Sequence, residues 1–167
     1  TLCTVLLVGV EAGAIAGVTA TISLILWRTS RPHTAIVGPV EGGEQFRNID
    51  RHLVKQVNQV LVLRIDESLF FGNLRYLDNR INGLLASHPA MEHLVLVASG
   101  INHIDSSALQ SLLELNTRLD DKGIKMHFSD VKGPVLDRLH RINFADELTG
   151  TVYLSQHQAW QDLTQLY

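Results

Sequence analysis

Residues 94–115 read LVLVASGINHIDSSALQSLLEL, and this stretch decides the fold. Its first five residues form a continuous apolar run, which is typical of a parallel strand covered on both faces. A loop follows, and a helix is predicted to begin near Asp105 or Ser106 and to end at Gly123. The predicted helix carries an apolar stripe made of Ala108, Leu112, Leu115 and Leu119. The stretch therefore predicts one strand-loop-helix unit.

The same order of elements precedes this stretch. Residues 60–65, VLVLRI, predict another strand. A helix is predicted after it, with Asn73 as its N-cap. The apolar positions of this helix follow helical spacing and are Leu74, Leu77, Ile81, Leu84 and Leu85. A short strand is also predicted over 34–40, and the glycine pair at 42–43 marks the turn that follows it.

One more strand and two more helices are predicted after Gly123. Residues 124–128 alternate between apolar and polar side chains, which predicts a strand whose Lys125 and His127 lie on a more exposed side. Pro134 suits the first turn of the next helix, and a last helix surrounds Trp160. Strands that alternate with helices predict a small α/β domain with a mostly parallel or mixed sheet. At roughly 130 residues the domain can hold one core.

Composition divides the chain into an apolar head and a charged body. Residues 1–27 contain one charged side chain, Glu11, whereas all 14 Lys and Arg lie from Arg28 onward. The head exceeds the roughly 20 apolar residues that a helix needs to cross a bilayer. A secretory signal would carry its basic residues before the apolar run, so the order found here disfavours a signal peptide. We expect residues 1–30 to end a transmembrane domain and residues 31–167 to form a cytoplasmic domain.

Three residues at the end of the head predict its orientation. Trp27, Arg28 and Arg31 have the composition of an interfacial anchor, in which an aromatic ring and cations lie at the surface of the lipid bilayer. The positive-inside rule places this end, and the body after it, in the cytoplasm. Because the chain opens inside an apolar run without an initiator methionine, we expect it to be a piece of a longer protein.

The carboxylate of Glu11 interrupts the apolar head. A charge in the bilayer is costly and usually faces protein or water. Two geometries fit: a single long tilted span, or a helix that ends at residue 10, a turn over 11–13 and a short last helix over 14–27. A structural role for Glu11 at a helix break is favoured over a role in an ion path. Close packing in a bundle, rather than a lone anchor helix, is indicated by the spacing of Gly9, Gly13 and Gly17.

The charge balance and the cysteine count argue against several classes of function. The body carries 16 of the 17 acidic groups and all 14 basic groups, so its formal charge of -2 disfavours a nucleic-acid partner. Cys3 is the one cysteine, which leaves no disulfide within the chain and no cysteine-based zinc site. The eight histidines lack the spacing of a metal site. No metal and no cofactor are therefore expected.

The loop that joins the buried strand to its helix is the candidate site. Ser106 and Ser107 stand at the predicted helix N-terminus, where serine hydroxyls cap exposed backbone N–H groups. The same N–H groups and the helix dipole could instead bind a phosphate or another anion. A nucleophilic role would need a paired base, and no Gly-x-Ser-x-Gly elbow is present, so no enzyme activity is predicted.

Asp105-Ser106-Ser107 after a strand resembles the signature loop of STAS domains, which anti-sigma factor antagonists share with the C-termini of sulfate permease (SulP) transporters. The hydroxyl that is phosphorylated in the antagonists maps onto Ser107. Ala108, where the antagonists usually carry glycine, places this sequence nearer the transporter branch. Other stretches resemble the SulP pattern in the same order, namely 9–13, 31–33, 71–73 and 132–135.

The resemblance implies a STAS fold, with a mixed, mostly parallel sheet of about four or five strands and helices mainly on one side. It implies a SulP-type secondary transporter of sulfate or bicarbonate in the plasma (inner) membrane, with the anion site upstream of Thr1. The STAS domain would serve regulation, trafficking and assembly of a homodimer, and its partners would be the upstream transmembrane domain and a cytoplasmic regulatory protein. Nucleotide binding, suggested for some STAS domains, lacks a Gly-rich phosphate loop here.

Two further expectations stay open at this stage. Phe70 and Phe71 precede a predicted helix, where they suit either a docking surface or a hydrophobic staple. The alternative function is a membrane-tethered STAS module that acts like an anti-sigma factor antagonist, through protein binding controlled by phosphorylation. A soluble α/β enzyme would need a catalytic group that the sequence does not offer.

Overall fold

The computed structural model describes residues 9–43 and 45–167 of the chain. The described residues divide into two compact units, with a boundary between Arg31 and Pro32. We call them the N-terminal unit and the C-terminal unit. Cys3 lies outside the described residues, as does the part of the apolar head before Gly9.

The C-terminal unit is built on one mixed sheet of six strands in the order β2-β1-β3-β4-β5-β6. Strand β1, next to the edge strand β2, pairs antiparallel with both β2 and β3, and β3, β4, β5 and β6 are parallel to one another. The strands are β1 (Thr34–Pro39), β2 (Phe46–Asn48), β3 (Val60–Ile65), β4 (His93–Val97), β5 (Lys125–Ser129) and β6 (Val152–Tyr153). The predicted α/β fold is confirmed, with more strands than the four or five expected. The two shortest strands, β2 and β6, lie at the edges of the sheet.

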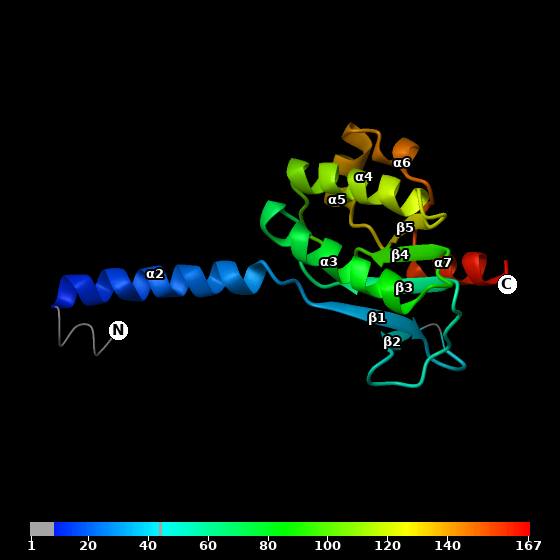
Figure 1. Ribbon diagram of the computed structural model, residues 1–167, viewed down its shortest axis with the longest axis horizontal. Coiled ribbons are helices and arrows are strands. Elements are labelled where there is room, and N and C mark those ends of the chain that lie inside the picture. Colours follow the sequence, from blue (N-terminus) through cyan, green and yellow to red (C-terminus); the bar gives the residue numbers. More distant parts are fainter. Residues whose placement is uncertain (1–8, 44) are drawn as a thin grey trace. The chain divides into compact units, whose positions relative to one another are not determined.

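Helices cover both faces of this sheet (Figure 1). The larger core lies on the face covered by α3 (Phe71–Ser87), α4 (Ser106–Asp120), α5 (Gly133–Arg141) and α6 (Phe144–Glu147). A smaller core lies under α7 (Gln156–Thr164), whose Trp160 packs edge-on against Phe46. Alternate residues of β3 point to the two cores: Leu61 and Leu63 to the larger, Val60 and Val62 to the smaller.

One expectation about β5 is wrong. The alternation of its residues predicted an exposed side, yet only Lys125 is exposed and His127 retains 3% exposure. The reason is tertiary, because Tyr153 of β6 lies against the ring of His127, with centroids 5.7 Å apart. A polar residue in an alternating strand therefore became part of the interior through a neighbour that follows it by more than twenty positions in the chain.

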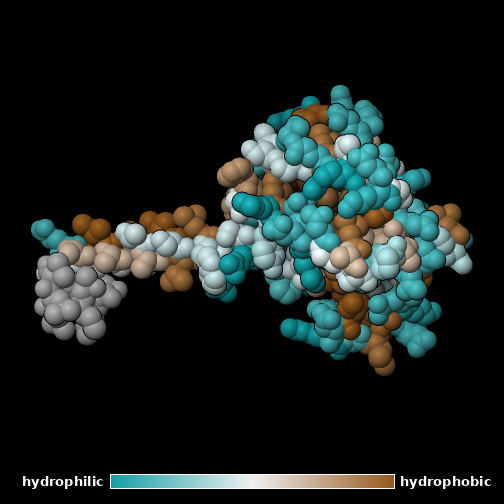
Figure 2. All heavy atoms as spheres, viewed as in Figure 1, coloured by the Kyte–Doolittle hydropathy of each residue, from teal (hydrophilic) through white to brown (hydrophobic). Residues whose placement is uncertain are grey.

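The N-terminal unit contains α2 (Val10–Thr29), a continuous helix. Glu11 lies in its first turn, so of the two geometries left open the one with a turn over 11–13 is not found, and Gly9, with a φ of 103°, directly precedes the helix. Within the described residues, α2 is the one helix that is long and apolar enough to cross a membrane, judged by length and composition. Its apolar side chains surround the helix and stay exposed, as the brown spheres in Figure 2 show.

Candidate functional site

Two loops at the carboxyl ends of β3 and β4 form the candidate site, because parallel neighbouring strands bring their carboxyl ends to the same edge of the sheet. The first loop covers residues 66–70 and leads into α3. The second covers residues 98–105 and leads into α4. At Gly100 the loops pack so closely that a Cβ atom would lie 2.5 Å from the carbonyl oxygen of Ile65 and 2.6 Å from the Cα of Asp66. Glycine is therefore required at this position.

Asp66 ties the start of the first loop to the strands beside it. Its carboxylate accepts a bond of 2.7 Å from Nε of Arg64 and lies 2.6 Å from Nδ1 of His33. Partial burial raises the pKa of Asp66, but the bonds from Arg64 and His33 outweigh burial, so the pKa lies below its ordinary value. The carboxylate is thus held ionised at the edge of the sheet.

Backbone and hydroxyl bonds join the two loops. The hydroxyl oxygen of Ser68 accepts from the backbone N–H groups of Asn102 (3.3 Å) and His103 (3.1 Å). Leu69 bridges Ile104 in parallel register, and the N–H of Asp105 donates to the carbonyl of Leu69 over 3.2 Å. Leu69 and Ile104 are both buried in the larger core. The second loop is therefore held to the first both by hydrogen bonds and by packing of Ile104 in the larger core.

Asp105, rather than either serine, caps α4. Its Oδ1 accepts from the N–H of Ala108 over 2.7 Å, and its Oδ2 accepts from the N–H of Phe71 over 3.1 Å. One carboxylate thus stabilises the N-termini of α4 and α3 together, where negative charge also complements both helix dipoles. Both carboxylate oxygens of Asp105 therefore serve to position the two helices.

The prediction that Asn73 is the N-cap of α3 is wrong, since the helix begins at Phe71 and Phe70 takes the cap position. Asn73 lies inside the first turn and is fully buried. Its Oδ1 accepts from the N–H of Phe70 (3.1 Å) and its Nδ2 donates to the carbonyl of Ser68 (2.8 Å). The amide side chain therefore folds the first loop back onto α3, a role that a shorter serine could not fill in both directions.

Ser106 and Ser107 are the first residues of α4, and both are exposed. Within residues 9–43 and 45–167, neither hydroxyl has a hydrogen-bond partner, so no side chain there is positioned as a base for them. The cations nearest to this loop come from α5 and its N-cap: Lys132 Nζ donates to Oδ1 of Asn102 over 2.6 Å, and Arg138 donates to the carbonyl of Ile104. The hydroxyls of Ser106 and Ser107 thus lie at the positive end of α4, next to a loop that is hydrogen-bonded by two cations. They could accept a phosphoryl group without rearrangement.

Phe70 and Phe71 have different surroundings. Phe70 is half-buried over Gly72, where a Cβ atom would lie 2.7 Å from the Phe70 ring. Phe71 is 79% exposed and stands at one end of a groove of about 620 Å³ between α3 and α4. Leucines form the floor of this groove, and the ion pair between Arg118 and Asp78 closes over it. Of the two aromatic residues, Phe71 is the one available to a partner.

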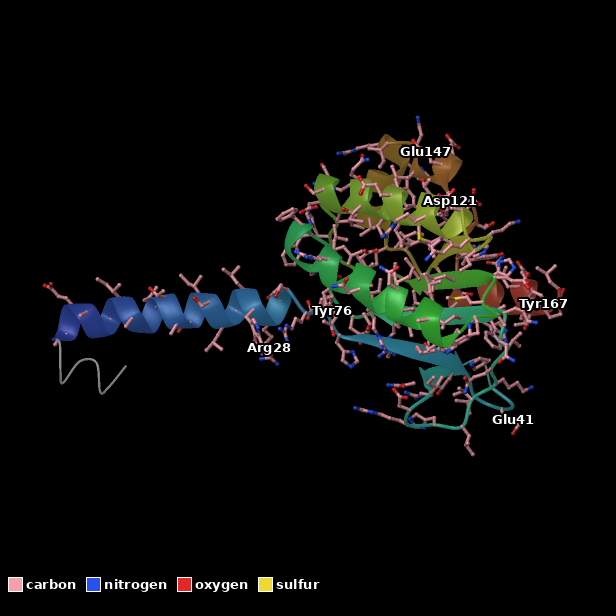
Figure 3. The ribbon with its side chains drawn as sticks, viewed as in Figure 1. Arg28, Glu41, Tyr76, Asp121, Glu147 and Tyr167 are labelled. Atoms are coloured by element: carbon pink, nitrogen blue, oxygen red, sulfur yellow. The ribbon has the colours of Figure 1, made fainter. Side chains whose placement is uncertain are left out.

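The residues predicted to form an interfacial anchor lie at the end of α2 and just beyond it. The guanidinium of Arg31 stacks over the ring of Trp27, with 4.6 Å between the guanidinium carbon and the ring centroid. Arg28 extends from the last turn of the helix (Figure 3). A cation stacked on an aromatic ring beside a second cation is the arrangement found where apolar helices leave the hydrocarbon core.

The sequence did not predict the residues that hold the second loop, residues 98–105, in place, namely Ser68, Lys132 and Arg138. Each lies 30 or more positions from the residue it contacts, and hydroxyl or cationic side chains at such positions carry no local pattern. Asn73 had a local pattern, but it predicted a cap instead of a buried link. No cluster of three or more His, Cys, Asp or Glu that could hold a metal ion occurs among the described residues.

Comparison with protein families shows which family the chain belongs to. Residues 52–159 match the model of the STAS domain, and the chain belongs to the STAS domain family. Among sequences, the chain is 30% identical over 152 residues to Sulfate transporter 1.3 of Arabidopsis thaliana and 27% identical over 147 residues to High affinity sulfate transporter 2 of Stylosanthes hamata. These matches cover 85% and 82% of the chain but only 23% and 22% of the relatives. The chain thus spans about a quarter of their length.

Solved structures show the same fold. The murine Slc26a9 anion transporter matches 93% of the chain with a TM-score of 0.77 at 16% identity, using 26% of its own chain. The STAS domain of a SulP transporter from Vibrio cholerae matches 71% of the chain with a TM-score of 0.56 at 17% identity, over 91% of its own length. A putative anti-sigma factor antagonist from Thermotoga maritima reaches 0.57 at 18% identity, over 66% of the chain and 92% of its own. These likenesses establish the fold.

Proposed function

We propose that the chain is the C-terminal part of a SulP-type secondary transporter of inorganic anions, of the sulfate or bicarbonate class. The observation that carries the proposal is a STAS unit that directly follows an apolar helix of membrane-crossing length. The 30% identity to a sulfate transporter covers 85% of the chain and supports the same conclusion. In this protein the STAS domain regulates transport and assembles a homodimer, and the anion path belongs to the remainder of the transporter.

The orientation of this assembly follows from its charges. Arg28 and Arg31 stand at the end of α2, so the positive-inside rule places the STAS unit in the cytoplasm, beneath a plasma (inner) membrane. The face of the STAS unit seen in Figure 2 is largely hydrophilic, as expected of a domain that contacts water and exchanges protein partners. The partners of the STAS unit are the transmembrane domain of the same protein and a cytoplasmic regulatory protein.

Full-length protein reconstituted in proteoliposomes is expected to take up radiolabelled sulfate or bicarbonate against empty liposomes. In sealed right-side-out cell vesicles, an epitope placed after Tyr167 should bind antibody only after permeabilisation. A folded full-length protein that transports no inorganic anion would contradict the proposal. Binding of antibody to intact vesicles would contradict the orientation alone, so the two parts are tested separately.

A second candidate function is a phosphorylation switch at Ser107, and the free, exposed hydroxyl at the α4 N-terminus favours it. Phosphorylation would add about -1.5 to -2 charges there, which the helix dipole stabilises and Asp105 opposes. Because these two effects offset each other, the variant Ser107→Asp should change partner binding or transport rate much more than the melting temperature.

The matched control for this switch is Gln110→Asp, which adds the same charge to an exposed position of α4 one turn further on. Transport rate and melting temperature of the full-length protein are measured for both variants, and the wild type is incubated with cell extract and ATP to look for phosphate on Ser107. A large loss of melting temperature with unchanged transport, or equal effects of the two variants on transport, would contradict the switch.

A further inference from the structure

Two histidines of neighbouring strands form a buried pair away from the two loops of the candidate site. His93 begins β4 and His127 lies in the middle of β5, and the two retain 7% and 3% exposure. Nδ1 of His93 and Nε2 of His127 are 3.0 Å apart, and the ring centroids are 5.2 Å apart. The imidazoles therefore share one hydrogen bond on the face of the sheet that α7 covers.

The backbone fixes which nitrogen of each ring carries the proton. The N–H of Thr151 donates to Nδ1 of His127 over 3.0 Å, so that nitrogen accepts with its lone pair and carries no proton. The proton of a neutral His127 is then on Nε2, which donates to Nδ1 of His93. His93 must in turn carry its proton on Nε2. The geometry is consistent only if both rings are neutral.

The surroundings also disfavour a charged ring. Burial is the largest cause of the low pKa of each histidine, and burial together with charge repulsion from His93 and Lys125 lowers the pKa of His127 to about 4. Lys125 repels charge on both rings, whereas Glu92 favours charge on His93. Facing the pair from β6 and the chain end are the rings of Tyr153 and Tyr167, and Asp162 of α7 acts on Tyr153. Of these groups only Glu92 acts in favour of a protonated pair, and it is already bonded to the Tyr167 hydroxyl over 2.8 Å.

A protonated His127 cannot be accommodated by a small shift. Its new N–H at Nδ1 would face the N–H of Thr151, so two donors would oppose each other. Gly150 packs so tightly here that a Cβ atom would lie 2.2 Å from the carbonyl oxygen of Met126 and 2.6 Å from Nδ1 of His127. The segment 150–153 must therefore move away from the sheet if His127 gains a proton.

The elements that would move are the least secured of the C-terminal unit. Strand β6 has two residues, and α7 covers the smaller of the two cores. At the junction of β5 and α7, three buried polar atoms have no partner among the described residues: Ser129 Oγ, Gln156 Oε1 and His157 Nδ1. At the other end of α7, Tyr167 is in contact with His93 and Glu92 (its position is labelled in Figure 3).

We propose that the His93–His127 pair is an acid-sensitive latch that holds β6 and α7 on the sheet and releases them when a ring is protonated. The released state exposes one face of the sheet, with Val62 and Val95, and the side of α7 that carries Trp160, to a partner or to solvent. The latch is independent of the transport proposal, because it rests on contacts within the C-terminal unit.

The sign of the pH effect follows from the two states. In the released state the histidines have the ordinary pKa of about 6.5, whereas in the latched state they stay neutral to lower pH. The released state therefore binds more protons, and it becomes more populated as the pH falls from about 6.5 toward 4. Each histidine that gains a proton on release should raise the opening equilibrium constant by up to about tenfold per pH unit in this window.

Hydrogen exchange of the whole chain in detergent, corrected for the intrinsic exchange rate, measures this opening between pH 7.5 and 5. Amides of α7 and β6 are expected to lose protection by roughly tenfold or more over this range, while amides of α4 lose less. The variants His93→Phe and His127→Gln should flatten the pH dependence, and His140→Gln, at an exposed histidine of α5, should leave it unchanged. Opening of α7 that is independent of pH in the wild type would overturn the latch. So would a wild-type pH dependence retained by both variants.

A measurement without substitution gives a second test. Nitrogen NMR of the histidine rings at pH 7 should show both as neutral rings protonated at Nε2. A charged ring at pH 7, or a ring protonated at Nδ1 alone, would overturn the proposed latch even if the variants proved too unstable to study.

Discussion

The variant Gly100→Ala is expected to destabilise the STAS unit by roughly 3 kcal/mol, although it adds a single methyl group. The added Cβ would meet the carbonyl oxygen of Ile65 at 2.5 Å, and the Cα and carbonyl carbon of Asp66 at 2.6 and 2.9 Å. All three atoms belong to the backbone, at the end of β3 and the start of the first loop, so no side chain can rotate away to relieve the overlap. The two loops of the candidate site would have to separate, which would also weaken the bonds at Ser68.

The matched control for Gly100 is Gly83→Ala, the same substitution in the interior of α3. No atom lies within 4 Å of a Cβ at Gly83, and alanine is favoured over glycine in a helix by about 0.5–1 kcal/mol. The two variants should therefore shift the free energy of unfolding in opposite directions. Urea unfolding followed by circular dichroism gives both values, and a loss in Gly100→Ala no larger than about 0.5 kcal/mol would show that the loops are not in tight contact.

The variant Asn116→Ala should cost roughly 2–4 kcal/mol, because it removes three hydrogen bonds made by a buried amide to partly buried groups. Asn116 lies in α4 and is 3% exposed. Its Nδ2 donates to the carbonyl of Glu147 (2.9 Å), and its Oδ1 accepts from the N–H (3.1 Å) and the hydroxyl (2.8 Å) of Thr149. These bonds connect α4 to the segment that enters β6.

Asn79→Ala, at an exposed position of α3, serves as the control for Asn116 and should change stability by less than about 0.5 kcal/mol. A further variant, Asn116→Asp, keeps an acceptor for Thr149 but loses the donor to Glu147 and buries a charge. It should be no more stable than Asn116→Ala. Thermal unfolding of the three variants tests this order, and equal melting temperatures for Asn116→Ala and Asn79→Ala would show that the link contributes nothing.

The elements predicted from the sequence were those with a strong local pattern. The apolar runs of β3 and β4 and the stripe of α4 are confirmed because parallel strands and their covering helices need continuous apolar surfaces. The edge strands β2 and β6 were missed, since two or three residues are too few for a pattern. His127 was misplaced because α7 and Tyr153, distant in the chain, decide its burial.

The candidate site could be predicted only in part for the same reason. Asp105, Ser106 and Ser107 are consecutive, so a helix N-terminus was expected around them, and α4 begins at Ser106. Which of the three would cap could not be read from the sequence, because each is a good N-cap residue. Asp105 is the residue that caps α4 because its second carboxylate oxygen accepts a hydrogen bond from the N–H of Phe71. Phe71 begins α3 and lies 34 positions earlier in the chain.

The lengths of the edge strands also bear on how copies of this domain behave at high local concentration. A sheet that ends in a long, flat strand presents a row of unpaired N–H and C=O groups, onto which a second sheet can add. Here the outermost strands span three residues in β2 and two in β6, so either edge offers few backbone groups for such growth. Sheet-to-sheet fusion and aggregation are thereby restrained. A homodimer of this chain should accordingly associate through side chains rather than through a shared sheet.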